Sequence, residues 1–134
     1  MANRLMTRSG AASLMICLVS SVFLPGCGPF VERHEVTQET AARLETEIKA
    51  YEPTDLKSLK YTTLYGLESW SCKNKLWDPS PTRSDALTQM KLKASEAGAN
   101  GIKDISCSTE GTSLGTNCWS AMRCVGTAIR VEAR

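Results

Sequence analysis

The sequence has no strong excess of charge of either sign and no apolar run long enough to cross a membrane. Its 134 residues include 16 Lys and Arg against 14 Asp and Glu, a formal net charge of +2. Because binding to nucleic acid requires many phosphate charges to be neutralised, this balance argues against a nucleic-acid-binding protein. The apolar run Ala11–Leu24 has 14 residues, which as a helix would cover about 21 Å of a hydrocarbon core roughly 30 Å thick. It is a poor transmembrane helix.

The residue patterns of metal, redox and catalytic sites are also missing. The sequence contains a single histidine, His34, and no Cys-x-x-Cys pair. Structural zinc sites use close ligand pairs, and thiol redox sites use the two-residue spacing. No group of residues suggests an acid, a base and a nucleophile acting together. We therefore predict no metal site, no cofactor and no enzymatic activity.

The amino-terminal segment has the three parts of a secretory signal. Arg4 and Arg8 precede the apolar run, no acidic residue occurs before position 28, and residues 24–27 read Leu-Pro-Gly-Cys. That tetrapeptide resembles the bacterial lipobox, in which a diacylglyceryl group is attached to the cysteine thiol and the new amine is acylated after cleavage. We predict a lipoprotein signal peptide over residues 1–26 and lipidation at Cys27. The alternative is ordinary secretion, with Cys27 as a free or bridged thiol.

The chain after the signal divides into two parts. Residues 27–46 are polar and charged with few large apolar side chains, which predicts a lipidated amino terminus and a tether. Residues 47–134 carry the periodic apolar patterns of one folded domain. Gly28 stands where the enterobacterial sorting pattern reserves Asp for retention in the inner membrane. We therefore expect an outer-membrane location, with the domain facing the periplasm.

The periodicities within the domain predict a small α+β fold with one main helix at about 82–97. Its start has a capping-box pattern, Thr82-Arg-Ser-Asp85, and Gly98 supplies a stop. Its apolar stripe consists of Leu87, Met90, Ala94 and Ala97. A short helix is expected at about 53–59, and a mostly antiparallel sheet of about four strands includes residues 61–70, 101–107 and 119–132.

The segment from Thr37 to Tyr51 permits two interpretations. Leu44, Ile48 and Tyr51 are spaced by four and three residues, which slightly favours a helix. Residues 47–51 also alternate between polar and apolar, which is typical of a strand.

Four cysteines fall within the domain, at positions 72, 107, 118 and 124. We predict two structural disulfides. If Cys118 and Cys124 both belong to the last strand, they lie roughly 20 Å apart, beyond the reach of a disulfide. Two pairings then remain, Cys72 with Cys118 and Cys107 with Cys124, or Cys72 with Cys124 and Cys107 with Cys118. Spacing alone does not decide between them.

The pattern of the domain resembles the RcsF family of outer-membrane lipoprotein sensors. The likeness extends over about residues 48–134 and rests on Ser71-Cys72, Met90, Ala94, Ala99-Asn100, Ser106-Cys107, Gly115, Cys118, Cys124, Gly126 and Ala128. It implies a small α+β fold with two non-consecutive disulfides, Cys72 with Cys118 and Cys107 with Cys124. It also implies a strand over Ile48–Tyr51.

The functional implications of the resemblance concern contact between proteins. RcsF-like proteins bind β-barrel outer-membrane proteins and their assembly machinery. Under envelope stress they engage the inner-membrane repressor IgaA, which relieves repression of the Rcs phosphorelay. We therefore expect an envelope-stress sensor that acts by contact. The runner-up is a structural or a metal- or thiol-handling periplasmic lipoprotein without a signalling role.

The three tryptophans are the candidate contact residues. Trp is favoured at the energetic centres of protein interfaces. Trp77 lies in a loop that contains Pro79 and Pro81, and it is the best candidate for a partner contact. We expect Trp70 and Trp119 to pack within or beside strands.

Overall fold

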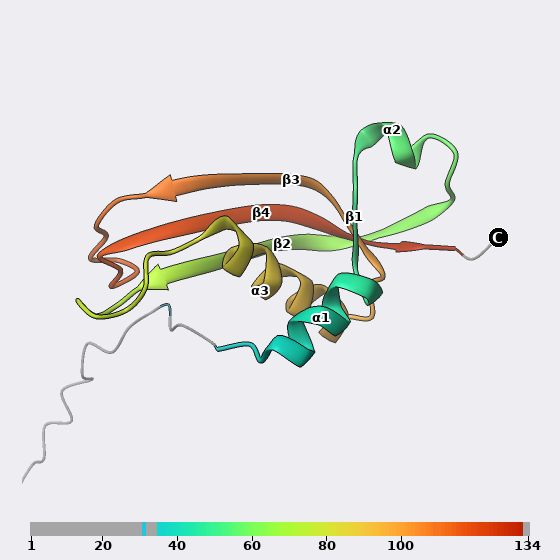
Figure 1. Cartoon of the computed structure of the whole chain (residues 1–134). Helices are drawn as coiled ribbons and strands as arrows, with labels where there is room; N and C mark the ends of the chain where they lie inside the picture. Colours follow the sequence, from blue (N-terminus) through green and yellow to red (C-terminus); the bar gives the residue numbers. More distant parts are fainter. Residues whose placement is uncertain (1–30, 32–34, 133–134) are drawn as a thin grey trace, which may run out of the picture.

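The computed structural model describes residue 31 and residues 35–132. The predicted signal peptide, Cys27 and the first part of the tether lie outside these residues. The described chain forms an α+β fold (Figure 1). Its elements in order are α1 (Gln38–Glu47), β1 (Lys49–Tyr51), α2 (Pro53–Leu56), β2 (Tyr61–Lys73), α3 (Arg83–Glu96), β3 (Gly101–Glu110) and β4 (Ser120–Val131).

The strands form one four-stranded sheet in the order β1-β3-β4-β2. β4 runs antiparallel to β2 and to β3, whereas β1 pairs with β3 in parallel through three residues. The prediction of a mostly antiparallel sheet with one main helix is therefore confirmed. β3 extends three residues beyond the predicted end at Cys107, and α2 is shorter than the predicted 53–59.

Helix α3 begins and ends where the sequence predicts. The Thr82 side chain accepts a hydrogen bond from the backbone N–H of Asp85 at 3.1 Å, which caps the first turn. Gly98 follows the helix with φ of +69°, a conformation that glycine adopts without strain. A β-carbon there would also lie 2.8 Å from Arg130 Nη2.

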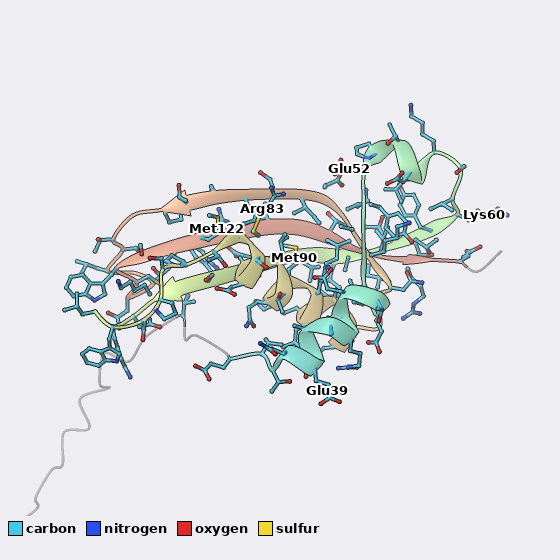
Figure 2. All side chains as sticks on the ribbon, in the orientation of Figure 1. Glu39, Glu52, Lys60, Arg83, Met90 and Met122 are labelled. Carbon is cyan, nitrogen blue, oxygen red and sulfur yellow. A yellow bond between two sulfur atoms is a disulfide. The ribbon has the colours of Figure 1, made fainter. Side chains whose placement is uncertain are left out.

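The core lies between α3, α1 and one face of the sheet. Met90, which is completely buried, projects from α3 into this space (Figure 2). The Ser69 hydroxyl of β2 donates to the carbonyl of Ala86 at 2.7 Å and so fixes the helix on the sheet. We call this set the helix-covered core; its buried members are Leu44, Ile48, Leu67, Ala86, Met90, Ala94, Ala99, Ile102, Cys124 and Ala128.

The amino-terminal boundary of the domain differs from the one predicted at residue 47. Residues 38–46, which we assigned to the tether, belong to α1, and Leu44 on this helix is completely buried in the core. Lys91 Nζ on α3 contacts Glu45 Oε2 at 2.5 Å, which adds an ion pair between the two helices. The polar composition of α1 misled the prediction, because a helix that covers one edge of a core needs few apolar residues.

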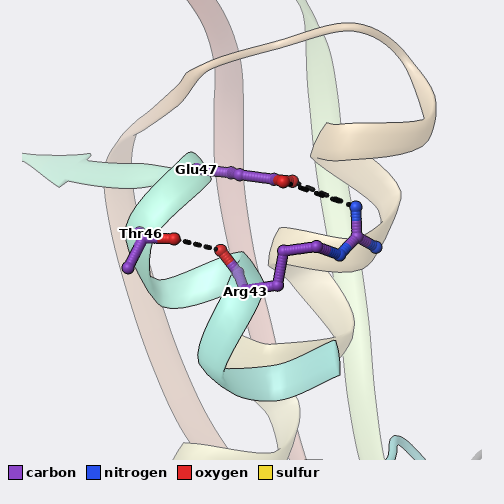
Figure 3. A network of polar contacts seen from close by, with 3 residues as sticks. All are labelled: Arg43, Thr46 and Glu47. Atoms are coloured by element: carbon purple, nitrogen blue, oxygen red, sulfur yellow. Dashed lines mark hydrogen bonds and ion pairs between the residues drawn. The ribbon is translucent and has the colours of Figure 1, made fainter. Parts of the chain in front are cut away.

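The two interpretations of residues 37–51 both describe part of the structure. Thr37 caps α1 by accepting from the N–H of Thr40, and the helix ends at Glu47. β1 then occupies Lys49–Tyr51, within the strand that the resemblance implied. The exposed side of α1 is polar: Arg43 Nη1 pairs with Glu47 Oε2 at 3.2 Å, and the Thr46 hydroxyl donates to the Arg43 carbonyl (Figure 3).

Candidate functional site

Two connecting loops lie side by side at one end of the sheet, opposite the end where α2 lies (Figure 1). The first joins β2 to α3 over residues 74–81, and the second joins β3 to β4 over residues 111–119. They are neighbours because Lys73 at the end of β2 pairs with Ser120 at the start of β4. The backbone N–H of Trp119 also donates to the Lys73 carbonyl at 2.8 Å. We call this part of the molecule the loop end.

The Cys72–Cys118 disulfide holds the loop end together. Both cysteines and Ala121 are 2% exposed and form a small cluster, against which Val31 and Trp70 pack. This cluster lies on the sheet face opposite α3. The second disulfide, Cys107–Cys124, joins directly paired residues of β3 and β4 and faces the helix-covered core. The structure thus has the pairing that the resemblance implied and one of the two that spacing left open.

Asn74 connects three segments at the loop end. Its side-chain amide donates to the Asn117 carbonyl at 3.1 Å and to the Val31 carbonyl at 2.9 Å. The Asp78 carboxylate accepts from the backbone N–H groups of Asn74 and Lys75 at 3.0 and 2.8 Å, which closes the turn between them. These bonds fix the first loop against the second and hold residue 31 beside both.

Large apolar side chains project from the two loops into solvent. The exposed fractions are 73% for Leu76, 79% for Trp77, 93% for Leu114 and 61% for Trp119. We call these four residues the loop-end patch. In the described part of the chain, the only other exposed large hydrophobic residues are Tyr61 and Tyr65, both on β2. Exposed apolar groups that gather at one end of a domain mark interaction sites more often than scattered single ones.

The three tryptophans differ in how far their side chains are exposed and in what they pack against. Trp77 is exposed on its loop, as a partner contact would be. Trp70 is partly buried against the Cys72–Cys118 cluster, and the Arg123 guanidinium lies 5.6 Å from its ring centroid. The expectation that Trp119 packs beside a strand is wrong. Trp119 precedes β4 by one residue and is 61% exposed.

Sequence reasoning therefore found one of the four patch residues. Leu76 adjoins Trp77 and could have been found from the same Pro-containing loop. Leu114 lies in a glycine-containing segment without charged residues, where a large apolar side chain has no strand or helix to pack against. From the sequence, this combination indicates that Leu114 is an exposed apolar residue on the second loop.

A shallow groove of about 360 Å³ lies between the segment before α1, the end of β2 and the first turns of α3. Its lining includes Glu35, Trp70, Cys72, Asp85 and Gln89. Within residues 31 and 35–132, no three His, Cys, Asp or Glu side chains are grouped so that they could hold a metal ion. No helix among these residues is long and apolar enough to cross a membrane. The loop-end patch is the candidate site, because it contains four exposed large apolar side chains.

No protein-family model and no curated protein sequence matches this chain.

Proposed function

We propose that the protein is an outer-membrane lipoprotein, anchored through Cys27, that senses envelope damage and activates the Rcs phosphorelay by contact. The observation that carries the proposal is the combination of a lipobox-like segment with the four-cysteine pattern of the RcsF family. The disulfides Cys72–Cys118 and Cys107–Cys124 support it, because the resemblance implied this pairing.

In this proposal the protein acts by binding and not as an enzyme. Its partners are an IgaA-like inner-membrane repressor, β-barrel outer-membrane proteins and the machinery that assembles them. Diacylglyceryl and N-acyl groups on Cys27 hold it at the membrane. Each buried CH₂ of such a chain contributes about 0.8 kcal/mol, so several chains would make attachment effectively permanent. Trp77 lies on the surface that we assign to contact, since its side chain is 79% exposed.

The decisive test is genetic. Deleting the gene should abolish induction of a capsule-type stress reporter by a drug that perturbs lipopolysaccharide. Re-expression of the full chain should restore induction. Unchanged induction in the deletion strain would refute the sensor function and favour a structural lipoprotein, which shares every other feature.

A metal- or thiol-handling role is tested separately by counting thiols. Alkylation of the denatured protein without reductant should label none of Cys72, Cys107, Cys118 and Cys124, since all four are disulfide-bonded. Labelling of all four in protein taken directly from cells would favour the thiol-handling alternative.

A further inference from the structure

We propose that the loop-end patch rests on the phospholipid surface of the membrane that carries the protein, with Trp77 and Trp119 at the level of the headgroups. This inference rests on the proposed lipidation of Cys27. It states what the loop-end patch contacts while the protein is anchored. The occupant to which we commit is the phospholipid bilayer.

The chemistry of the loop end suits a membrane interface. Indole rings are enriched where hydrocarbon meets headgroups, because they combine a large apolar surface with one N–H donor. Two such rings and two leucines project from the same pair of loops. Residues 111–119 include no Asp, Glu, Lys or Arg, so bringing this loop to the lipid buries no charged side chain.

Two basic residues near the patch suit an anionic lipid surface, although the acidic Glu110 directly precedes the second loop. Lys73 ends β2 and Lys75 lies within the first loop, and a basic side chain near such a surface contributes about 1 kcal/mol of attraction. The acidic residue of this turn, Asp78, directs one carboxylate oxygen to the backbone N–H groups of Asn74 and Lys75. Its negative charge is therefore partly compensated within the turn.

The position of Val31 brings the proposed anchor to the same end of the molecule. Val31 packs on the Cys72–Cys118 cluster, and its carbonyl accepts from Asn74. Cys27 precedes Val31 by 31 − 27 = 4 residues. Four residues span at most about 14 Å when fully extended, whatever path they take. A lipid on Cys27 thus holds the loop end, and not the opposite end with α2, close to the bilayer.

The proximity to the anchor is what favours lipid over the other possible occupants. A second copy of this chain or a protein partner would also cover apolar side chains. Neither would require that the patch adjoin the lipidated residue. Contact with the membrane does require that the patch lie near the lipidated residue. Only the part of the domain that is close to its lipid anchor can stay in contact with the bilayer.

The test uses the full-length lipidated protein in vesicles of phosphatidylethanolamine with a minor fraction of phosphatidylglycerol. Brominated acyl chains in the same lipids quench indole fluorescence only at close range. In single-tryptophan variants, Trp77 (with W70F and W119F) and Trp119 (with W70F and W77F) should shift to the blue and be quenched by brominated lipid. Trp70 (with W77F and W119F) should show neither change, because it packs against the disulfide cluster.

A matched pair of substitutions guards against effects on folding. Leu114→Ser in the wild-type background keeps all three reporters and should reduce the quenching. Tyr61→Ser alters another exposed aromatic residue, at the far end of β2, and should leave it unchanged. Both variants should keep the thermal transition of the parent protein, which shows that they fold.

The outcomes separate the docking from the anchor. An unmodified Cys27 in the mass spectrum and no flotation with vesicles would mean that the lipoprotein proposal fails. Protein that floats with vesicles while Trp77 and Trp119 stay unshifted and open to aqueous acrylamide would overturn the docking alone. A blue shift that grows with protein density and occurs without lipid quenching would also overturn it, in favour of a second copy.

Discussion

The helix-covered core and the loop end use their apolar residues in opposite ways. Leu44 and Met90 are completely buried beneath two helices, whereas Trp77 and Leu114 project into solvent. Each region contains one disulfide. In the core the bridge adds to an already packed interior. At the loop end a bridge and a few small buried groups hold the loops, which leaves the large side chains available for contact. Large apolar side chains are thus buried by packing in one region and left exposed in the other.

The largest expected effect is loss of the loop-end disulfide. The double substitution Cys72→Ala, Cys118→Ala opens a bridge between residues separated by 46 positions, and the chain-entropy relation gives about 4 kcal/mol of lost stability. Chemical denaturation should show this decrease. Hydrogen exchange should in addition show that amides of residues 111–119 lose more protection than those of α3.

The core disulfide provides the control for that measurement. Cys107→Ala with Cys124→Ala opens a bridge of separation 17, for which the same relation gives about 3 kcal/mol. Here the extra loss of protection should fall on β3 and β4 at the core. The same local pattern of exchange in both double variants would remove the distinction between the two regions.

Truncation of Met90 should separate stability from contact. Met90→Ala leaves a cavity in a fully buried site, and such substitutions cost about 2–5 kcal/mol. Under conditions where the variant is folded, quenching of its tryptophans by brominated lipid should equal that of the wild type. Leu114→Ala is the converse variant, with a stability change within about 0.5 kcal/mol and weaker lipid contact. A stability loss in both variants would contradict the division of roles.

The cap of α3 should contribute less. Thr82 accepts from the N–H of Asp85, and its own N–H donates to the Ser71 hydroxyl at 3.2 Å. Thr82→Ala removes the side-chain cap and should cost about 1 kcal/mol, measured as a shift of the denaturation midpoint. Ser84→Ala, on the exposed first turn of the same helix, is the control. It should be neutral or slightly stabilising, because alanine is the better helix former.

The smallest expected effect is at the surface of α1. Arg43 and Glu47 have side chains about half exposed, and ion pairs of this type contribute about 0.3–0.5 kcal/mol. Arg43→Ala should therefore barely change the denaturation midpoint. Lys91→Ala should cost more, since the Lys91 side chain is only 11% exposed and its ammonium group meets Glu45. The reverse order would mean that the contact between α1 and α3 is not part of the stabilising core.

The sequence predicted well those elements whose signals are local. A cap at Thr82 and a glycine at position 98 define α3 without reference to the rest of the fold. The alternation in residues 119–132 likewise marked β4, because a strand in a sheet has a fixed two-residue repeat. Which cysteines pair did not follow from spacing, since the choice depends on the order of the strands in the sheet.

The features that sequence reasoning missed depend on what lies next to a residue in space. The few apolar residues of α1 predict a tether, yet Leu44 is completely buried in the core and Glu45 forms an ion pair with Lys91 of α3. The position of Trp119 at the start of the last predicted strand favours packing within or beside that strand, but its side chain is exposed. Its exposure follows from the place where β4 begins, a boundary that periodicity defines only within a few residues. Of the four patch residues, the sequence therefore predicts only Trp77 as a contact residue, and the other three become apparent from the fold.

The placement of the two disulfides on opposite faces has a mechanical consequence. β4 is paired on both sides, and Cys124 bonds across to β3 while Cys118, just before β4, bonds to the end of β2. A slip of β4 by one residue would turn every side chain to the other face, and either covalent bond prevents it. The two bridges join β4 covalently to both of its neighbours, so the central three strands cannot slide past one another while the disulfides are intact.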